Sequence, residues 1–160
     1  MTAIVGLARA GRVYMGGDSA MTTEHGEQWL CAAPKVWRSG AYVFGASGDS
    51  DYIELAKLAL ERQPDAPADV PGLIAKVLAE SGSEATGSLI LGHEGRLYEL
   101  AGSAVVRYAG GLLCTGSGRS EARAALYRRP GAPLALVRLA LAAAADTRSD
   151  VRRPFHVVSA

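Results

Sequence analysis

The order of strand-type and helix-type segments is the feature of this sequence that most limits its fold. Short apolar runs separated by glycine turns fill residues 3–46 and again residues 87–115, a pattern typical of antiparallel strands. Each group is followed by two segments with apolar residues at helical spacing, and one more apolar run closes the chain at 154–159. Because the helices come in pairs and do not alternate singly with strands, the order argues against a parallel βαβ fold.

The individual elements are predicted as follows. Strands are expected at 3–8, 13–17, 28–31, 35–38, 41–46, 87–92, 96–100, 104–108, 112–115 and 154–159. Helices are expected from the capping candidates at 49–51 to Leu60 and at 70–80, 120–127 and 133–145, with the proline-rich stretch 63–71 as a loop. An α+β fold of four layers (αββα) uses every segment, as two stacked antiparallel sheets with two helices outside each. We expect residues 1–160 to form one domain that buries roughly two-thirds of its unfolded surface.

The charge balance argues against nucleic acid as a partner. The chain has 17 basic and 16 acidic side chains, for a net charge of +1, whereas nucleic-acid-binding proteins usually carry a strongly basic face. The short cluster of Arg148, Arg152 and Arg153 is a weak candidate for a polyanion site, and we interpret it as solvated surface.

The cysteines and the apolar segments point to a cytoplasmic protein without a metal or other cofactor. Cys31 and Cys114 lie far apart, and neither has the partners of a zinc site or of a disulfide framework. The first residues lack the basic and long apolar regions of a signal peptide. The apolar stretch 133–145 is too short to span a bilayer and contains Arg138, so we expect no membrane association.

A threonine at position 2 acquires chemical meaning if Met1 is removed. Thr2 then carries a hydroxyl nucleophile and a free α-amine on one residue. That amine has a pKa of about 8 in model compounds, close enough to neutrality for a general base. A threonine with its own N-terminal amine is a known activated nucleophile.

Such a nucleophile needs a nearby cation and a carboxylate that orients it. Lys35 is the candidate cation and Asp18 the candidate carboxylate. Asp18 closes the second strand of the first predicted hairpin, and the end of that strand lies beside the start of the first strand. Simple hairpin geometry therefore brings Asp18 close to Thr2. Taken singly, Asp18 is also explained as a turn residue and Lys35 as a surface lysine at a strand edge.

Several short motifs occur in a fixed order along nearly the whole chain. They are Thr2-Ala3-Ile4-Val5-Gly6, Gly16-Gly17-Asp18-Ser19, Lys35-Val36, Gly45-Ala46-Ser47-Gly48, Asp51, Cys114-Thr115-Gly116-Ser117-Gly118, Glu121-Ala122 and Asp146-Thr147-Arg148-Ser149. In this combination, and with sixteen residues from threonine to aspartate, the sequence resembles proteasome β subunits and the bacterial proteasome-like peptidase HslV. The fold that the resemblance implies is the N-terminal-nucleophile (Ntn) hydrolase fold.

The resemblance also implies a role for each matching residue. Thr2 would be the nucleophile, with its amine as proton acceptor, and Lys35, held by Asp18, would keep the pKa of that system low. The backbone N–H of Gly48 would stabilise the oxyanion. The remaining matches, Ser117, Asp146 and Ser149, would form the hydrogen-bonding shell around the terminal amine.

The implied function is a threonine-type peptidase that cleaves peptide bonds in peptides or unfolded proteins through an acyl-enzyme. Met21 and Thr22 would border the substrate and bind its backbone as an added strand, and Ser47 would lie near the specificity pocket. The resemblance further implies self-association into a ring or barrel, with an ATP-dependent unfoldase as a potential partner.

Three other interpretations are weighed against this one. Gly45-Ala46-Ser47-Gly48 resembles a nucleophile elbow, but Asp49 occupies the position of its last glycine, and no histidine has an obvious triad partner. Gly116-Ser117-Gly118 before a helix is a phosphate-loop candidate that lacks the flanking motifs. The strongest rival is a catalytically inactive scaffold subunit of a homo-oligomer, although such subunits tend to lose the threonine, lysine or aspartate.

Overall fold

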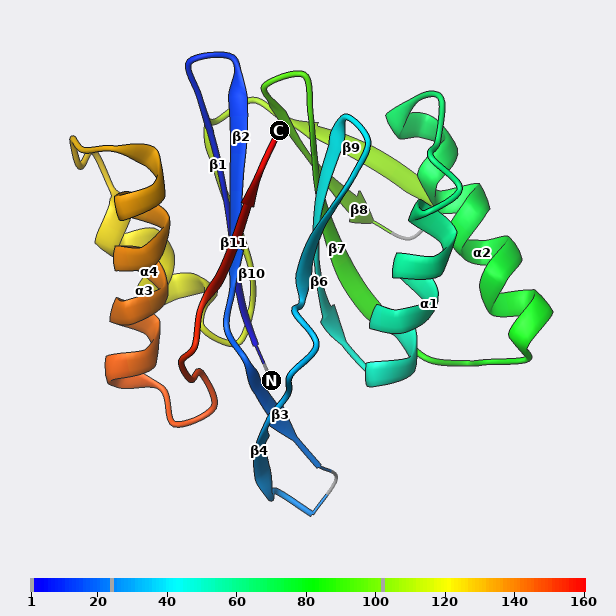
Figure 1. The fold of residues 1–160 in the computed structure, drawn as a ribbon, viewed down its shortest axis with the longest axis horizontal. Coiled ribbons are helices and arrows are strands. Elements are labelled where there is room, and N and C mark those ends of the chain that lie inside the picture. Colours follow the sequence, from blue (N-terminus) through cyan, green and yellow to red (C-terminus); the bar gives the residue numbers. More distant parts are fainter. Residues whose placement is uncertain (1, 24, 102) are drawn as a thin grey trace.

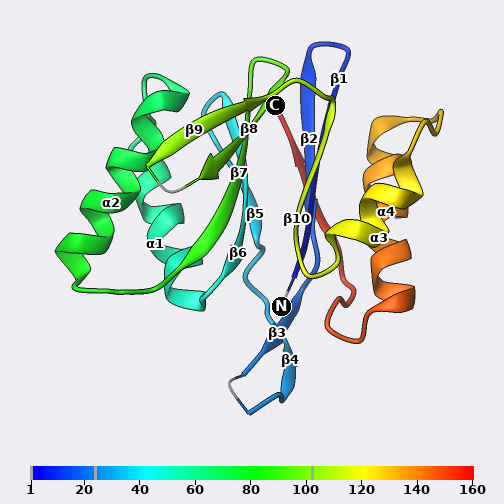
Figure 2. The same cartoon turned by 180° about the vertical axis from the view of Figure 1, so that it is seen from behind.

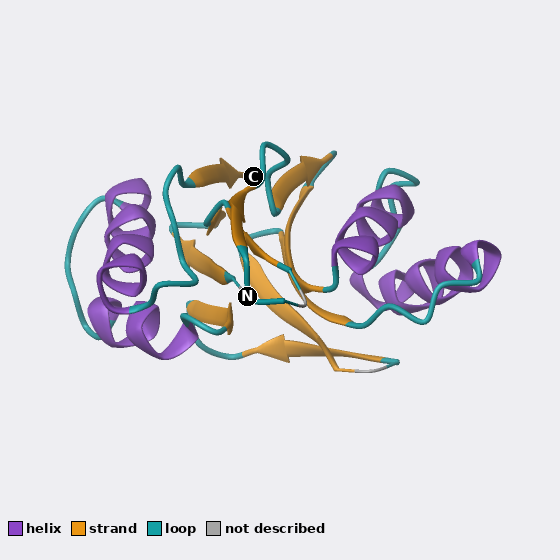
Figure 3. Ribbon diagram, turned by 90° about the horizontal axis from the view of Figure 1, so that it is seen from below, coloured by secondary structure: helices purple, strands orange, loops and turns teal. Residues whose placement is uncertain are grey.

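Two stacked β-sheets, each covered on its outer face by a pair of helices, form four layers in this computed structural model, which describes residues 2–23, 25–101 and 103–160. Helices α1 (Ser50–Leu60) and α2 (Val70–Ser81) lie outside one sheet. Helices α3 (Arg119–Leu126) and α4 (Pro133–Thr147) lie outside the other. Viewed end-on in Figure 3, the strands lie between the two helical layers. The predicted αββα architecture is confirmed.

Every strand pairs antiparallel to its neighbours. The first sheet has the order β10-β1-β2-β11, with β1 (Ala3–Arg9), β2 (Arg12–Gly17), β10 (Leu112–Gly116) and β11 (His156–Ser159). The second has the order β5-β6-β7-β8-β9, with β5 (Val36–Ser39), β6 (Tyr42–Gly48), β7 (Gly87–His93), β8 (Arg96–Ala101) and β9 (Ala104–Tyr108). A two-stranded ribbon of β3 (Ala20–Thr22) and β4 (Gln28–Leu30) projects from the body beside the N-terminus (Figure 1).

Strand β1 is buried on both faces because it lies between the second sheet and the α3–α4 layer. Its side chains alternate, as the two-residue period of a strand requires. Ile4 packs between the sheets, with Met15, Val43 and Ile90 among its cluster. Ala3 and Val5 face the other way, into the cluster formed with α3 and α4. A third cluster joins the second sheet to α1 and α2.

Glycine replaces a side chain at a close contact between the two sheets. Gly45 of β6 faces β1, and a methyl group at this position would clash with Ile4 and lie 2.9 Å from the sulfur of Met15. This close approach brings β6 onto the beginning of β1, the end of the strand at which Thr2 stands.

The observed elements match the predicted ones to within a few residues, with two additions. Strand β3 is only three residues long, too short to give a periodic signal. The predicted loop 63–71 contains a 3-10 turn at Pro67–Asp69, where the Asp69 carboxylate accepts a hydrogen bond of 2.9 Å from the N–H of Ala66. The last strand begins at His156 instead of Pro154, since proline has no N–H for the sheet. Among the described residues, no helix is long and apolar enough to cross a membrane.

We predict that Gly45→Ala destabilises the protein by about 1–3 kcal/mol, because the added methyl group overpacks the contact between the sheets. Gly72→Ala is the matched control, since a Cβ there meets no atom within 4 Å and alanine favours the helix in which it lies. Thermal unfolding should therefore show a lower Tm for Gly45→Ala and an equal or higher Tm for Gly72→Ala. Equal stability of both variants would contradict this packing.

Candidate active site

Thr2 is buried directly before β1, and the loop after β10 closes over its backbone. The carbonyl of Thr2 accepts a hydrogen bond of 3.3 Å from the N–H of Gly118, and the Ser117 oxygen lies 3.2 Å from the same carbonyl oxygen. The backbone nitrogen of Thr2 donates to the Ser117 oxygen at 3.2 Å. Gly116 has a φ of +87°, and a side chain there would collide with the Thr2 carbonyl. Glycine at position 116 is thus what lets the loop reach Thr2.

The ammonium group of Lys35 lies against the side chain of Thr2. Lys35 stands immediately before β5, is only 6% exposed, and its Nζ donates to Thr2 Oγ1 at 2.6 Å. The same nitrogen donates to Asp18 Oδ1 at 3.2 Å and to the backbone carbonyl of Ala20. The predicted contact among Thr2, Lys35 and Asp18 is therefore present in the structure.

Asp18 is fully buried and holds three separate chain segments together. Its Oδ1 accepts a hydrogen bond of 2.9 Å from the N–H of Ala3, as well as the bond from Lys35. Its Oδ2 accepts from the N–H groups of Ala20 at 2.8 Å and Arg152 at 3.3 Å. Position 18 reaches this point because Gly17 pairs with Ile4 in the β1–β2 hairpin, as the sequence predicts.

Burial lowers the pKa of Lys35 below its ordinary value, and the Coulomb attraction and hydrogen bond of Asp18 oppose this shift only in part. A buried ammonium with a lowered pKa, in contact with a hydroxyl oxygen, favours the anionic form of that hydroxyl. The pair can therefore activate Thr2 Oγ1 for attack on an electrophile.

The structure does not bring Asp146 and Ser149 to this cluster, and the place expected for Asp146 is taken by Asp150. Asp146 lies in the last turn of α4 with its side chain exposed, and Ser149 is exposed after the helix ends. Asp150 is buried and accepts hydrogen bonds from Arg148 at 3.0 and 3.3 Å. Burial alone would raise the pKa of Asp150, but hydrogen bonds from Arg148 and Ser117 outweigh it and lower that pKa.

One signal in the sequence points to Asp150. It directly precedes Val151, a buried apolar residue that packs against the α3–α4 cluster just beyond the helix end. An aspartate beside such an anchor is carried into the interior, whereas Asp146 belongs to the outward face of a helix that continues to Thr147.

Gly48 and Asp49 form a tight turn between β6 and α1. Gly48 has a φ of +128°, and a side chain there would meet the Thr86 carbonyl and the Gly87 backbone. The Asp49 carboxylate makes no capping bond to α1 and instead accepts from the N–H of Thr86 at 2.8 Å and from its hydroxyl at 3.3 Å. Thr86 thus hydrogen-bonds the Asp49 carboxylate, which directly follows Gly48 in the sequence.

A pocket of about 1190 Å³ brings most of the predicted residues to one surface. Seven predicted residues line it: Thr2, Met21, Thr22, Lys35, Ser47, Gly48 and Ser117. Asp18 lies behind them, and Cys31, for which the sequence predicts neither a zinc site nor a disulfide, also lines the pocket. No histidine is found among the described residues of this lining, so a serine–histidine arrangement at Ser47 has no support here. In the described part of the chain, no group of three or more His, Cys, Asp or Glu side chains could hold a metal ion.

Comparison with known proteins gives structural but no sequence matches. No protein-family model and no curated protein matches the chain. BPH from Thiobacillus denitrificans in complex with epoxomicin has a similar fold, with a TM-score of 0.82, 17% sequence identity, and coverage of 99% of this chain and 98% of that one. Eukaryotic HslV from Trypanosoma brucei matches with a TM-score of 0.74, 20% identity, and coverage of 99% of this chain and 98% of that one. Anbu, an ancestral beta-subunit from Yersinia bercovieri, matches with a TM-score of 0.77, 12% identity, and coverage of 99% of this chain and 81% of that one.

The chain has the proteasome-type Ntn-hydrolase fold. The fold implied by the sequence resemblance is thereby confirmed. The coverage is nearly complete on both sides for BPH and HslV, so every layer of this chain has a counterpart in those proteins.

We predict that Asp150→Ala costs about 1–3 kcal/mol of folding free energy, because Ser117 and Arg148 lose a charged partner. Asp146→Ala is the matched control and should change stability by less than about 0.5 kcal/mol, as expected for an exposed site. Because the pKa of Asp150 is lowered on folding, its contribution is present above about pH 4 and is lost as the pH falls further. Urea unfolding at pH 7 and pH 3 checks both points; equal stability of the two variants at pH 7 would contradict the assignment.

Proposed function

We propose that this chain is a threonine endopeptidase, an Ntn hydrolase that uses Thr2 as its nucleophile once Met1 has been removed. Met1 itself lies outside the described residues. The observation that carries the proposal is the 2.6 Å contact between Lys35 Nζ and Thr2 Oγ1, with Asp18 behind the lysine. The proteasome-type fold supports the proposal independently of this contact.

In the proposed mechanism, the α-amine of Thr2 accepts the proton of Oγ1 while Oγ1 attacks the carbonyl carbon of the scissile peptide bond. Lys35 stabilises the developing negative charge on Oγ1. The tetrahedral oxyanion receives a hydrogen bond from the N–H of Gly48, and one such donor is typically worth about 3–4 kcal/mol. The protonated amine then gives its proton to the leaving amine, and an ester on Thr2 remains.

The same amine serves the second half of the reaction. It takes a proton from a water molecule, which attacks the ester and releases the acid, and Thr2 Oγ1 regains its proton. Ser117 and Asp150 would hold the amine in place: the Thr2 nitrogen lies 3.2 Å from the Ser117 oxygen, and Ser117 in turn bonds Asp150. These two residues are positioning residues, since they act through the amine and not on the substrate.

We assign the substrate strand to the edge of β3. Met21 and Thr22 line the pocket, and an extended peptide would add to this short ribbon while its side chain enters between Met21 and Ser47. This arrangement accepts any peptide segment that lacks structure of its own, so peptides and unfolded proteins are the proposed substrates.

Self-association into a ring or barrel is the assembly that we propose, with an ATP-dependent unfoldase as partner. Trp29 and Leu30 of the β3–β4 ribbon are both more than half exposed, and contacts between copies would cover such side chains. The rival function, an inactive scaffold subunit, requires the same assembly without turnover.

We predict that Thr2→Ala lowers kcat in a peptidase assay by at least about a thousandfold, as expected for loss of a nucleophile. Thr2→Ser should retain measurable turnover because it keeps both the hydroxyl and the amine. Lys35→Ala should lose activity to a similar extent, whereas Lys76→Ala, an exposed lysine of α2, should behave as wild type. Circular dichroism would establish that each variant is folded. Unchanged turnover in both Thr2→Ala and Lys35→Ala would refute the mechanism.

The mass of the active protein tests the requirement for a free amine. We expect the peptidase to have lost one methionine, because a retained Met1 occupies the nitrogen that serves as base. Protein that retains Met1 should be inactive. If intact-mass measurement finds full-length chain in every preparation, and none has activity, the scaffold function is the correct one.

A further inference from the structure

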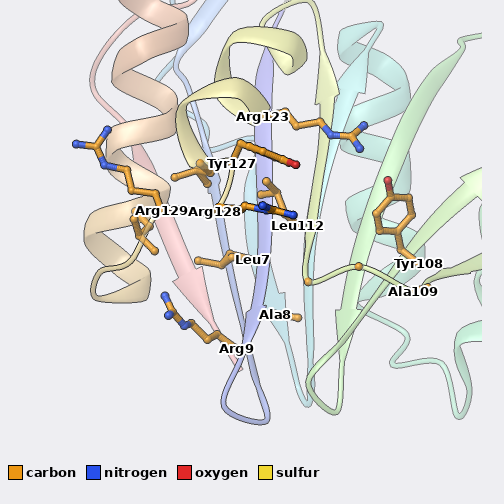
Figure 4. Close-up of a pocket in the computed structure, with 14 residues that line it drawn as sticks. Leu7, Ala8, Arg9, Tyr108, Ala109, Leu112, Arg123, Tyr127, Arg128 and Arg129 are labelled. Atoms are coloured by element: carbon orange, nitrogen blue, oxygen red, sulfur yellow. The ribbon is translucent and has the colours of Figure 1, made fainter.

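A second pocket, of about 630 Å³, lies at the opposite end of β1 from Thr2. Its lining comes from the end of β1 at Leu7–Arg9, from the connection between β9 and β10 at Tyr108–Leu112, and from the end of α3 with the turn that follows it (Figure 4). The proposed peptidase mechanism uses none of these residues.

Arginines dominate this pocket. Of the described residues that line it, four are arginines and none is acidic; the four are Arg9, Arg123, Arg128 and Arg129. In Figure 4, Arg128 extends across the pocket toward Leu112, and Arg123 extends toward Tyr108. Within the described part of the chain, neither of these two side chains forms an ion pair. Their charges are therefore available to an anion from outside the protein.

The net charge of the whole chain does not reveal the basic character of this pocket. Residues 109–145, which include β10, α3 and most of α4, contain five basic side chains and one acidic side chain, although the whole chain has a net charge of only +1. The excess is offset elsewhere, because residues 49–99 contain ten acidic and four basic side chains. The fold thus concentrates positive charge on the α3–α4 side of the sandwich.

The turn after α3 is shaped so that Arg128 lies at the pocket. Helix α3 ends at Leu126, and Arg128 adopts a φ of +52°, which residues with a side chain rarely adopt. Its guanidinium lies 5.4 Å from the centre of the Tyr127 ring, a cation–π contact that helps to fix its direction. Arg9 bonds the Gly131 carbonyl at 2.8 Å and so ties this turn to β1.

The rest of the lining is apolar or aromatic. Leu7 and Leu112 are half-buried in the lining, and the residue Tyr127 beside them is 73% exposed. Guanidinium groups bind phosphate oxygens in a bidentate manner, and exposed aromatic rings stack on planar groups. The volume falls within the usual range of about 300–1000 Å³ for small-molecule sites.

We propose that this pocket binds a small phosphorylated molecule of nucleotide size, with its phosphate on Arg123 and Arg128 and its aromatic portion on Tyr127. The bound molecule touches β1, β10 and α3 together. Strands β1 and β10 connect the two sites: their paired residues Leu7 and Leu112 line this pocket, and their paired residues Ala3 and Gly116 lie beside Thr2. The site does not depend on the peptidase proposal.

Isothermal titration calorimetry of the full chain with ADP, pyrophosphate and adenosine tests this site. We expect saturable binding of ADP with one site per chain, affinity that falls as NaCl is raised, and at least tenfold weaker binding of adenosine. The double variant Arg123→Gln/Arg128→Gln should bind ADP at least about tenfold more weakly, as expected for the loss of charge-assisted hydrogen bonds. The matched control Arg119→Gln/Arg138→Gln removes two exposed arginines of α3 and α4 outside the lining and should bind as wild type.

The variant Tyr127→Ala distinguishes the contribution of the phosphate to the binding affinity from that of the aromatic portion. We expect it to weaken ADP binding and to leave pyrophosphate binding unchanged. Absence of saturable binding of ADP and pyrophosphate at millimolar concentration, or equal affinities in the two double variants, would overturn the site. Equal affinity for ADP and pyrophosphate in wild type and in Tyr127→Ala would overturn the aromatic part of the assignment.

Discussion

A buried ion pair between Asp18 and Lys35 is the interaction around which the start of the chain is organised. Removing two charges from water is costly, and such a pair persists only where further hydrogen bonds satisfy both partners. Here the Asp18 carboxylate accepts from three backbone N–H groups, of Ala3, Ala20 and Arg152, in addition to Lys35. These groups belong to β1, β3 and the segment before β11. One carboxylate thereby joins both ends of the chain at the point where Thr2 lies.

In the proposed mechanism, the same burial that makes the pair costly also serves the chemistry. Lys35 has a lowered pKa because it is desolvated, and it lies where β6 packs against β1 and β5 packs against β2. The glycine at position 45 permits that approach, and the glycine at position 116 permits the loop of Ser117 to close over Thr2. Packing and reactivity are therefore two aspects of one arrangement, and changes at these glycines should affect both.

The sequence predicts the features that arise from local pairing. A hairpin joins β1 to β2, so the position of Asp18 beside Thr2 follows from its register, and the paired helices predict the four layers. Contacts between distant segments are predicted only where the family resemblance supplies them, as it does for Lys35 and Ser117 beside Thr2. Asp150 is missed because the sequence does not show that α4 continues to Thr147 and that Val151, beside Asp150, is buried in the α3–α4 cluster. The arginine pocket is missed because its residues come from β1 and from α3, more than a hundred positions apart.

The central claim is that Thr2 Oγ1 and the Thr2 amine act together as nucleophile and base. An epoxyketone tests it most directly, because its ketone and its epoxide can react with a hydroxyl and an amine on the same residue. Protein that has lost Met1 would be treated with an epoxyketone peptide and digested, and the modified residue located by mass spectrometry. The account predicts one adduct, on the N-terminal peptide that begins with Thr2, and none in Thr2→Ala. An adduct on Cys31 or Lys35, or equal labelling of Thr2→Ala, would contradict it.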